Sequence, residues 1–195
     1  MSSMVKEKHL KWSIIAIIFI LFTVFVTLLN VKNNSQYNEL TKELKSNQII
    51  AGTVDVQGKG VIITLTDSEN FSNNSTEDKV NYIVHDQDLI YIVNDLENAG
   101  AEAISINDER LNTLSKIKAK GMKIKINEHE YEPPFVIKAI GNPNSLESTL
   151  KSTENELNIR KDMFGIGVDI KKSDKIFIPK YNGNIKFKYA QPVTK

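Results

Sequence analysis

Five polar residues in the middle of the chain have the types needed to bind an anion or to move a proton. Asp67 follows one apolar run, His85 precedes a helical pattern, and Asn107, Asp108 and Arg110 follow the next apolar run. If the two runs are neighbouring strands, these side chains gather at one edge of a sheet. Arg110 would then pair bidentately with Asp67, or with a carboxylate or phosphate from outside. The alternative, which the sequence favours, is an internal ion pair with turn-forming residues.

Other chemistry has weaker support. His85, Asp86 and Asp88 have ligand types for a cation, but carboxylates at a helix start are explained by capping without a metal. Of the remaining histidines, His9 is expected on the cytoplasmic side, and His129, between Glu128 and Glu130, is expected to be solvated in a polar turn. No serine has the G-x-S-x-G context of a hydrolase, and the chain has no cysteine. We therefore predict no enzyme, no cofactor and no metal.

The elements that position these residues follow from hydrophobic patterning. Residues 53–67, TVDVQGKGVIITLTD, predict a strand with two similar faces, which is typical of a central strand. Gly58-Lys59-Gly60 precedes the apolar part of the strand, whereas a phosphate-binding loop follows a strand and opens a helix. We therefore expect a turn or bulge there.

Residues 82–108 predict a helix followed by a strand. Leu89, Ile92, Val93, Leu96 and Ala99 recur with helical spacing and make one apolar face. His85 or Asp86 can cap the start of this helix, and Gly100 suits the left-handed position that ends it. Residues 103–106 then form the strand.

The sequence of the rest of the domain predicts further short strands and helices. KIKAKGMKIKIN predicts a hairpin turning at Lys120-Gly121, and FVIKAIG a more buried strand. Asn142 or Ser145 can cap a short helix, a capping box at residues 153–156 predicts another, and VDIKKSDKIFIP predicts a hairpin turning at Ser173-Asp174. The expected fold class is α+β, a single exported domain with a mostly antiparallel sheet covered by about three helices on one face.

Trp12 to Leu29 is an uninterrupted run of uncharged residues, WSIIAIIFILFTVFVTLL. As a helix it spans roughly 27 Å, close to the hydrocarbon core of a bilayer. A cleaved signal peptide would have a shorter apolar region followed by small residues, and a core helix would have a polar face. We therefore predict an uncleaved transmembrane signal anchor.

The flanks of this run predict its orientation. Lys6, Lys8 and Lys11 precede it and only Lys32 follows closely, which places the N-terminus in the cytoplasm by the positive-inside rule. The expected organisation is a cytoplasmic N-terminus (1–11), a single-pass anchor in the cell membrane (12–29), a stalk (30–50) and an extracytoplasmic domain (51–195). Basic and acidic residues nearly balance, 25 against 24, so no global field indicates nucleic acid.

The stalk carries Tyr37, Leu40 and Leu44 at 3–4 spacing among charged residues. This pattern fits a short parallel coiled coil between neighbouring anchors, and equally a solvated stalk helix, since two heptads fall short of a convincing repeat. Both interpretations stay open.

Several motifs in order resemble one family: GKGVIITLTDS, VHDQDLIYIVNDLENAGAEAISIND with Arg110, PPFVIKAIGNP, FGIGVDI and IFIPKY. They are similar to a bacterial membrane-anchored family of unknown function known as division initiation proteins (YlxX/YlxW-like). The resemblance spans roughly residues 54–193. It implies one N-terminal membrane helix, a coiled coil that is usually longer than here, an exported α+β domain and a cell-envelope role linked to division. Lys59 stands where the family usually has proline.

The sequence and the resemblance together lead to two alternative hypotheses about function. The first is a non-enzymatic, membrane-anchored interaction or scaffold protein of the bacterial cell envelope, self-associating and binding an envelope or division protein. The alternative is an exported domain that senses a small anion near Arg110.

Overall fold

The computed structural model describes residues 3–70, 79–152 and 156–193, with side chains of the N-terminal helix described for Phe19 and from Leu21 onward. Helix α1 (Ser3–Ile50) is continuous over 48 residues. By internal contacts the chain divides into residues 1–47 and residues 48–195. The predicted anchor, residues 12–29, falls partly on side chains outside the described set. Within the described part of the chain, no helix has an apolar stretch long enough to cross a membrane.

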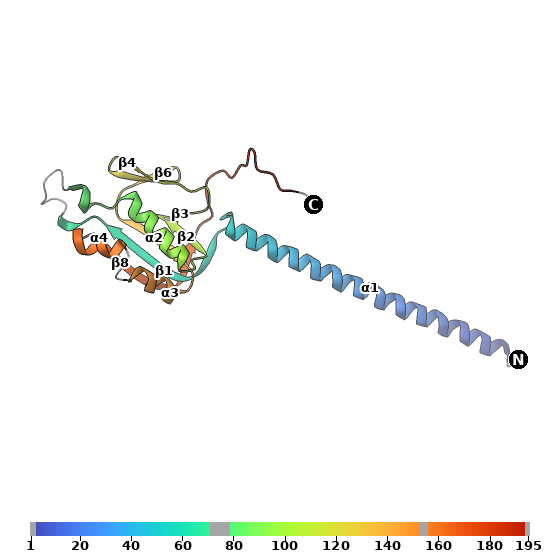
Figure 1. The fold of residues 1–195 in the computed structure, drawn as a ribbon. Helices are drawn as coiled ribbons and strands as arrows, with labels where there is room; N and C mark the ends of the chain where they lie inside the picture. Colours follow the sequence, from blue (N-terminus) through green and yellow to red (C-terminus); the bar gives the residue numbers. More distant parts are fainter. Residues whose placement is uncertain (1–2, 71–78, 153–155, 194–195) are drawn as a thin grey trace. The chain divides into compact units, whose positions relative to one another are not determined.

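The domain, residues 48–195, contains a five-stranded antiparallel sheet (Figure 1). Its strands are β1 (Val56–Thr66), β2 (Ala103–Ile106), β3 (Glu109–Arg110), β7 (Phe135–Ile140) and β8 (Gly167–Ile178), in the spatial order β3-β2-β7-β1-β8. Strand β1 lies between β7 and β8 and buries Val61, Ile63 and Leu65 completely. The prediction of a central strand is confirmed.

The glycines of β1 allow a close approach between strands. The register of β1 against β8 shifts between Gly58 and Gly60, which is a β-bulge. A Cβ on Gly60 would lie 1.8 Å from the carbonyl oxygen of Ala139 in β7, so no side chain fits there. The segment that superficially resembles a phosphate loop is therefore a bulge within a strand, as the order of elements predicted.

The predicted hairpin at residues 168–179 is wrong. Strand β8 runs without a turn for 12 residues and pairs with β1 along its length. The polar Ser173-Asp174 pair that suggested a turn lies at a bulge in β8, which carries one extra residue between the partners of Gly58 and Gly60. A bulge absorbs polar, turn-like residues without reversing the chain, which is why a local pattern could not separate the two.

The domain also contains a second, three-stranded antiparallel sheet, whereas the sequence predicted a single sheet. Strands β4 (Ile117–Lys120), β5 (Lys123–Ile126) and β6 (His129–Tyr131) pair in chain order. The predicted turn between β4 and β5 is confirmed, with Gly121 at φ 64°. Ile124 and Ile126 are buried, whereas the lysines point to the opposite face.

Helices α2 (Asp86–Asn98), α3 (Pro143–Leu150) and α4 (Glu156–Phe164) share one hydrophobic core with the five-stranded sheet, and α2 contacts both others. A short 3₁₀ helix, η2 (Lys79–Tyr82), precedes α2. Gly100, at φ 87°, ends α2, and Asn142 caps α3 by accepting hydrogen bonds from two backbone N–H groups, as predicted. Most of the capping box expected before α4 lies outside the described residues. An α+β fold with antiparallel sheets is confirmed.

Candidate functional site

The five predicted site residues do not share one edge of the sheet. Strands β1 and β2 point the same way, because both pair antiparallel with β7, and Ile63 and Ile106 both lie opposite Ile137. Strand β7 nevertheless separates them, so the premise that they are neighbours is wrong. Asp67 and Arg110 therefore bind different partners.

Asn107 and Asp108 form the tight turn of the β2–β3 hairpin. Both residues have positive φ, 47° and 65°, as a type I′ turn requires, and Asn and Asp tolerate this conformation. The side-chain oxygen of Asn107 also accepts a hydrogen bond from the N–H of Val136 at 2.7 Å. Asp108 forms an ion pair with Lys138 at 2.6 Å. These two residues have the turn-forming role that the alternative interpretation gave them.

Arg110 binds the C-terminal end of α1. Its Nη2 donates a hydrogen bond to the carbonyl oxygen of Ile49 at 2.9 Å, and the side chain of Asn112 donates to the carbonyl of Ala51 at 3.3 Å. Gly52, at φ 71°, ends the helix, and a Cβ added there would lie 3.4 Å from Cγ of the arginine. Unpaired carbonyls at a helix C-terminus carry partial negative charge, so a cation there is favourable.

Only one of the three guanidinium nitrogens of Arg110, Nη2, has a hydrogen-bond partner among the described residues. The residue is 3% exposed, and within the described residues its Nε and Nη1 have no hydrogen-bond partner. Ser105, its cross-strand neighbour, is fully buried with an unpartnered Oγ. Burial lowers the pKa of Arg110, because desolvation disfavours the charged guanidinium. Buried donors without partners are costly, so this pair of residues is the described place where an added ligand oxygen would gain most.

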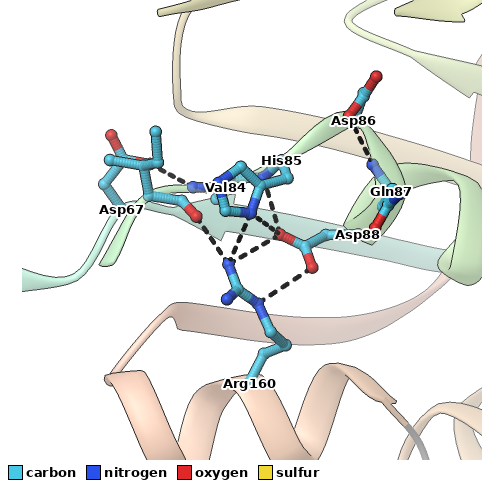
Figure 2. A network of polar contacts seen from close by, with 8 residues as sticks. Asp67, Val84, His85, Asp86, Gln87, Asp88 and Arg160 are labelled. Atoms are coloured by element: carbon cyan, nitrogen blue, oxygen red, sulfur yellow. Dashed lines mark hydrogen bonds and ion pairs between the residues drawn. The ribbon is translucent and has the colours of Figure 1, made fainter. Parts of the chain in front are cut away.

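Asp67 and His85 lie together at a second cluster, which joins α4 to the start of α2 (Figure 2). Asp67 accepts a hydrogen bond from the N–H of Val84 at 2.8 Å. Asp88 accepts one from the N–H of His85 at 2.7 Å, as a capping carboxylate does. Burial raises the pKa of Asp67, and the hydrogen bond from Val84 and the His85 side chain oppose that rise.

Arg160 completes this cluster, and the sequence analysis missed it. Its Nε lies 3.1 Å from Oδ1 of Asp88, and its Nη2 lies 3.3 Å from Oδ2 and 3.1 Å from Nδ1 of His85. The same Nη2 donates to the carbonyl of Ile83 at 2.8 Å, and the guanidinium lies over the ring of Phe164. Both side chains of the Asp88–Arg160 pair are about nine-tenths buried.

A compositional signal was available for both arginines. The chain has 25 basic residues, and only two of them, Arg110 and Arg160, are arginines. In a lysine-rich chain an arginine marks a position where a planar, multiply donating cation is required. Both prove to be buried at junctions between elements.

A third polar cluster surrounds the buried carboxylate of Glu109. Its oxygens accept hydrogen bonds from Asn127 at 3.2 Å and from the Tyr131 hydroxyl at 3.1 Å, and His129 Nδ1 lies 2.7 Å away. Burial and the bond to Glu109 raise the pKa of Tyr131 to about 12. The expectation that His129 is merely solvated is therefore incomplete, because a buried carboxylate orients its ring.

These polar clusters hold neighbouring elements of the domain together. Each carboxylate is satisfied by N–H or O–H donors of its own domain, and the Asp88 and Asp86 side chains serve α2 and its neighbour strand β4. Among the described residues, no group of three or more histidine, aspartate or glutamate side chains is placed to hold a metal ion. His85, Asp86 and Asp88 cap and brace the helix, which accounts for their spacing.

Beside Arg110 lies an open groove of about 820 Å³. Its walls come from α2, from the edge formed by β2 and β3, and from the segment leading into β4. The lining combines apolar and charged side chains, among them Ile50, Ile90, Val93, Ile104, Arg110, Leu111, Lys116, Ile117 and Lys118. A site with these properties accommodates an extended, partly apolar partner better than a small polar substrate.

The structure places the chain in the class of proteins with a long N-terminal helix followed by an α+β domain with antiparallel sheets. The model for the bacterial protein of unknown function DUF881 matches residues 43–191, and the chain belongs to this family. The resemblance drawn from the sequence motifs is thereby confirmed.

Curated relatives include two from Bacillus subtilis (strain 168). UPF0749 protein YlxW is 33% identical over 119 residues, which cover 61% of this chain and 51% of YlxW. UPF0749 protein YlxX is 31% identical over 127 residues, covering 61% and 53%. UPF0749 protein Rv1823 of Mycobacterium tuberculosis is 27% identical, covering 75% and 50%. The chain thus spans about half the length of the curated relatives it matches.

One solved structure is similar over nearly its whole length. The crystal structure of an uncharacterized conserved protein from Mycobacterium tuberculosis superposes with a TM-score of 0.62 at 25% identity, covering 77% of this chain and 99% of that one. The fold of the domain therefore occurs in an experimentally determined relative.

Proposed function

We propose that this chain is a non-enzymatic, membrane-anchored interaction module of the bacterial cell envelope. In this proposal the anchor is residues 12–29, the N-terminus is cytoplasmic and the domain is extracytoplasmic. The division link is the one that the family resemblance implies. The observation that carries the proposal is the groove beside Arg110, which adjoins the C-terminal end of α1 and has an apolar, partly basic lining.

The described part of α1 supports a membrane location. Its large apolar side chains are mostly exposed around the helix, including Phe22 at 63%, Phe25 at 58% and Leu28 at 63%. An exposed apolar surface of this extent requires lipid or another protein to cover it. Farther along, Tyr37, Leu40 and Leu44 are also exposed, which supports self-association through the stalk.

Topology can be tested with a single introduced cysteine, because the natural chain has none. Lys175→Cys, on an exposed position of β8, should react with a membrane-impermeant maleimide on intact cells. The matched protein with residues 12–29 deleted should leave the membrane fraction. Labelling only after cell lysis, or a full-length chain that stays soluble, would contradict the anchor and its orientation.

Partner binding can be tested with a photo-crosslinking residue in α2. Ile90 lines the groove, whereas Tyr91, one position along the helix, is exposed outside it. In the full-length chain in its membrane, crosslinks to an envelope protein should form from position 90 and not from position 91. Equal crosslinking from both positions, or none from position 90, would count against the groove as the partner site.

The second candidate function is anion sensing, and the unpartnered donors of Arg110 and Ser105 favour it. An anion at a hundred times its dissociation constant stabilises the folded form by about 2.7 kcal/mol, which shifts a melting temperature by several degrees. The full-length chain in detergent would be melted with inorganic phosphate and with acetate. A shift that Arg110→Met abolishes supports sensing, and no shift with either anion speaks against it.

A further inference from the structure

The C-terminal segment has the sequence of a strand, but it pairs with no strand in the described part of the chain. In residues 184–190, NIKFKYA, Ile185, Phe187 and Tyr189 alternate with Lys186 and Lys188, which is the period of a half-buried strand. The structure assigns residues 179–193 to no helix or strand. Phe187 is 70% exposed and Tyr189 is 86% exposed.

The two sheets leave four edge strands open to an added strand: β3, β8, β4 and β6. Strand β3 has two residues, too few for a seven-residue segment. Strand β8 carries three lysines and two aspartates, a net charge of +1, so it offers the lysines of the tail no net attraction. Strand β4 carries Lys118 and Lys120 and already donates its Ala119 N–H to Asp86.

Strand β6 is the edge with the complementary charge. With its flanking residues it reads EHEYE, so Glu128, Glu130 and Glu132 alternate with His129 and Tyr131. The tail has lysines on one face and aromatic residues on the other. Laid beside β6, it sets lysine against glutamate on one face and Phe187 beside Tyr131 on the other, and both are favourable cross-strand pairs.

The glutamates of β6 have room for further partners. Glu130 pairs with Lys120, and Glu132 with Lys123 at 3.1 Å, but the two side chains remain 37% and 63% exposed. A carboxylate has two oxygens and accepts more than one donor. Lys120 and the hydrogen bond it makes lower the pKa of Glu130, so this carboxylate is charged at neutral pH.

We propose that the tail, residues 184–190, adds as a strand to the β6 edge of a second copy of this chain. Among the described residues of one chain, both the tail and its β6 edge are unpaired, so an exchange between two copies satisfies both. The proposal deepens the proposed self-association by naming its surface. It does not depend on the groove or on the membrane orientation, which separate experiments test.

Charge reversal tests the exchange in the full-length chain in lipid nanodiscs. One variant is K186E/K188E, and the other is E130K/E132K. Association through the tail is followed by disulfide formation between His129→Cys in one copy and Tyr189→Cys or Ile185→Cys in a differently tagged copy. His129 shares the face of Tyr131, and the two tail positions cover both strand directions. The natural chain contributes no cysteine. Lys171→Cys on β8 replaces the β6 cysteine in the control.

Each reversal alone should lower the crosslinking yield about ten-fold, since attraction becomes repulsion at two pairs. A mixture of the two variants should recover the yield, because each tail then meets a β6 edge of opposite charge. Unchanged melting temperatures of the variants would show that they fold. Crosslinking that neither reversal affects, or that is no higher than in the β8 control, would overturn the proposal. So would a disulfide that forms when both cysteines are in one chain but not between differently tagged copies, which would mean that the tail pairs with its own β6.

Discussion

The guanidinium of Arg160 in α4 holds the carboxylate of Asp88 in α2 through two atoms, with Nε 3.1 Å from Oδ1 and Nη2 3.3 Å from Oδ2. The same carboxylate accepts the N–H of His85 at the start of α2. One arginine therefore joins a C-terminal helix to the cap of a helix more than 70 residues earlier. Because the pair is nearly buried, its two members depend on each other.

Removing either member should be strongly destabilising. Arg160→Ala leaves the Asp88 carboxylate buried without its cation, and breaking a buried pair in this way costs about 3–5 kcal/mol. Chemical denaturation of the domain checks this value. Lys161→Ala, the exposed neighbour on the same helix, is the control and should change stability by less than about 0.5 kcal/mol. A loss in Arg160→Ala as small as that of the control would show that the pair contributes little.

Asp67 should make stability depend on pH. Burial raises its pKa above the ordinary value of 3.8, so the folded chain holds this proton more tightly than the unfolded chain. The stabilisation is therefore complete below about pH 4 and is lost as the pH rises through the folded pKa. Asp67→Asn keeps an oxygen to accept the Val84 N–H but has no charge to desolvate. Its stability relative to the natural chain should rise across that window and then stay level, as denaturation at a series of pH values would show.

The control for this pH dependence is Asp67→Ala, which also removes the charge but loses the acceptor. It should be about 1–3 kcal/mol less stable than Asp67→Asn at every pH, because the N–H of Val84 is left unpaired. If Asp67→Asn follows the pH profile of the natural chain, another group is responsible for that profile.

Stable folding should require glycine at position 60 but not at position 100. An added Cβ at Gly60 meets the Ala139 carbonyl oxygen at 1.8 Å, whereas at Gly100 nothing lies within 4 Å. Gly60→Ala must push β1 from β7 and should prevent stable folding. Gly100→Ala meets only the strain of φ 87°, about 1 kcal/mol. Thermal melting of both variants tests this ordering, and a well-folded Gly60→Ala would refute the close approach.

Patterns within one element were predictable, and contacts between distant elements were not. The face of α2, its end at Gly100 and the central strand β1 depend on periodicity and on local backbone preference. The partner of Arg110 is the end of a helix some 60 residues earlier, and that of Asp88 is an arginine some 70 residues later. No local spacing encodes such pairs, so Arg160 was missed and Arg110 was paired with the wrong residue.

The prediction of a hairpin at β8 was wrong for a different reason. Ser173-Asp174 has the composition of a turn, but whether the chain reverses there is decided by the partner strand. Here β8 carries one extra residue opposite Lys59 of β1, which makes a β-bulge in a continuous strand. A strand interrupted by polar residues and a hairpin therefore have the same local pattern.

The β2–β3 turn should tolerate glycine at one position and not alanine at the other. Asp108 has φ 65° and its side chain is 65% exposed, so Asp108→Gly relieves backbone strain and loses only a surface pair with Lys138. Asn107 also has positive φ, but its side chain accepts the Val136 N–H. Asn107→Ala adds strain and removes that acceptor, which together should cost about 2–3 kcal/mol. Hydrogen exchange of the Val136 amide is the most direct measurement. Exchange should accelerate in Asn107→Ala and not in Asp108→Gly. Equal rates in the two variants would mean that the Asn107 side chain does not stabilise β7.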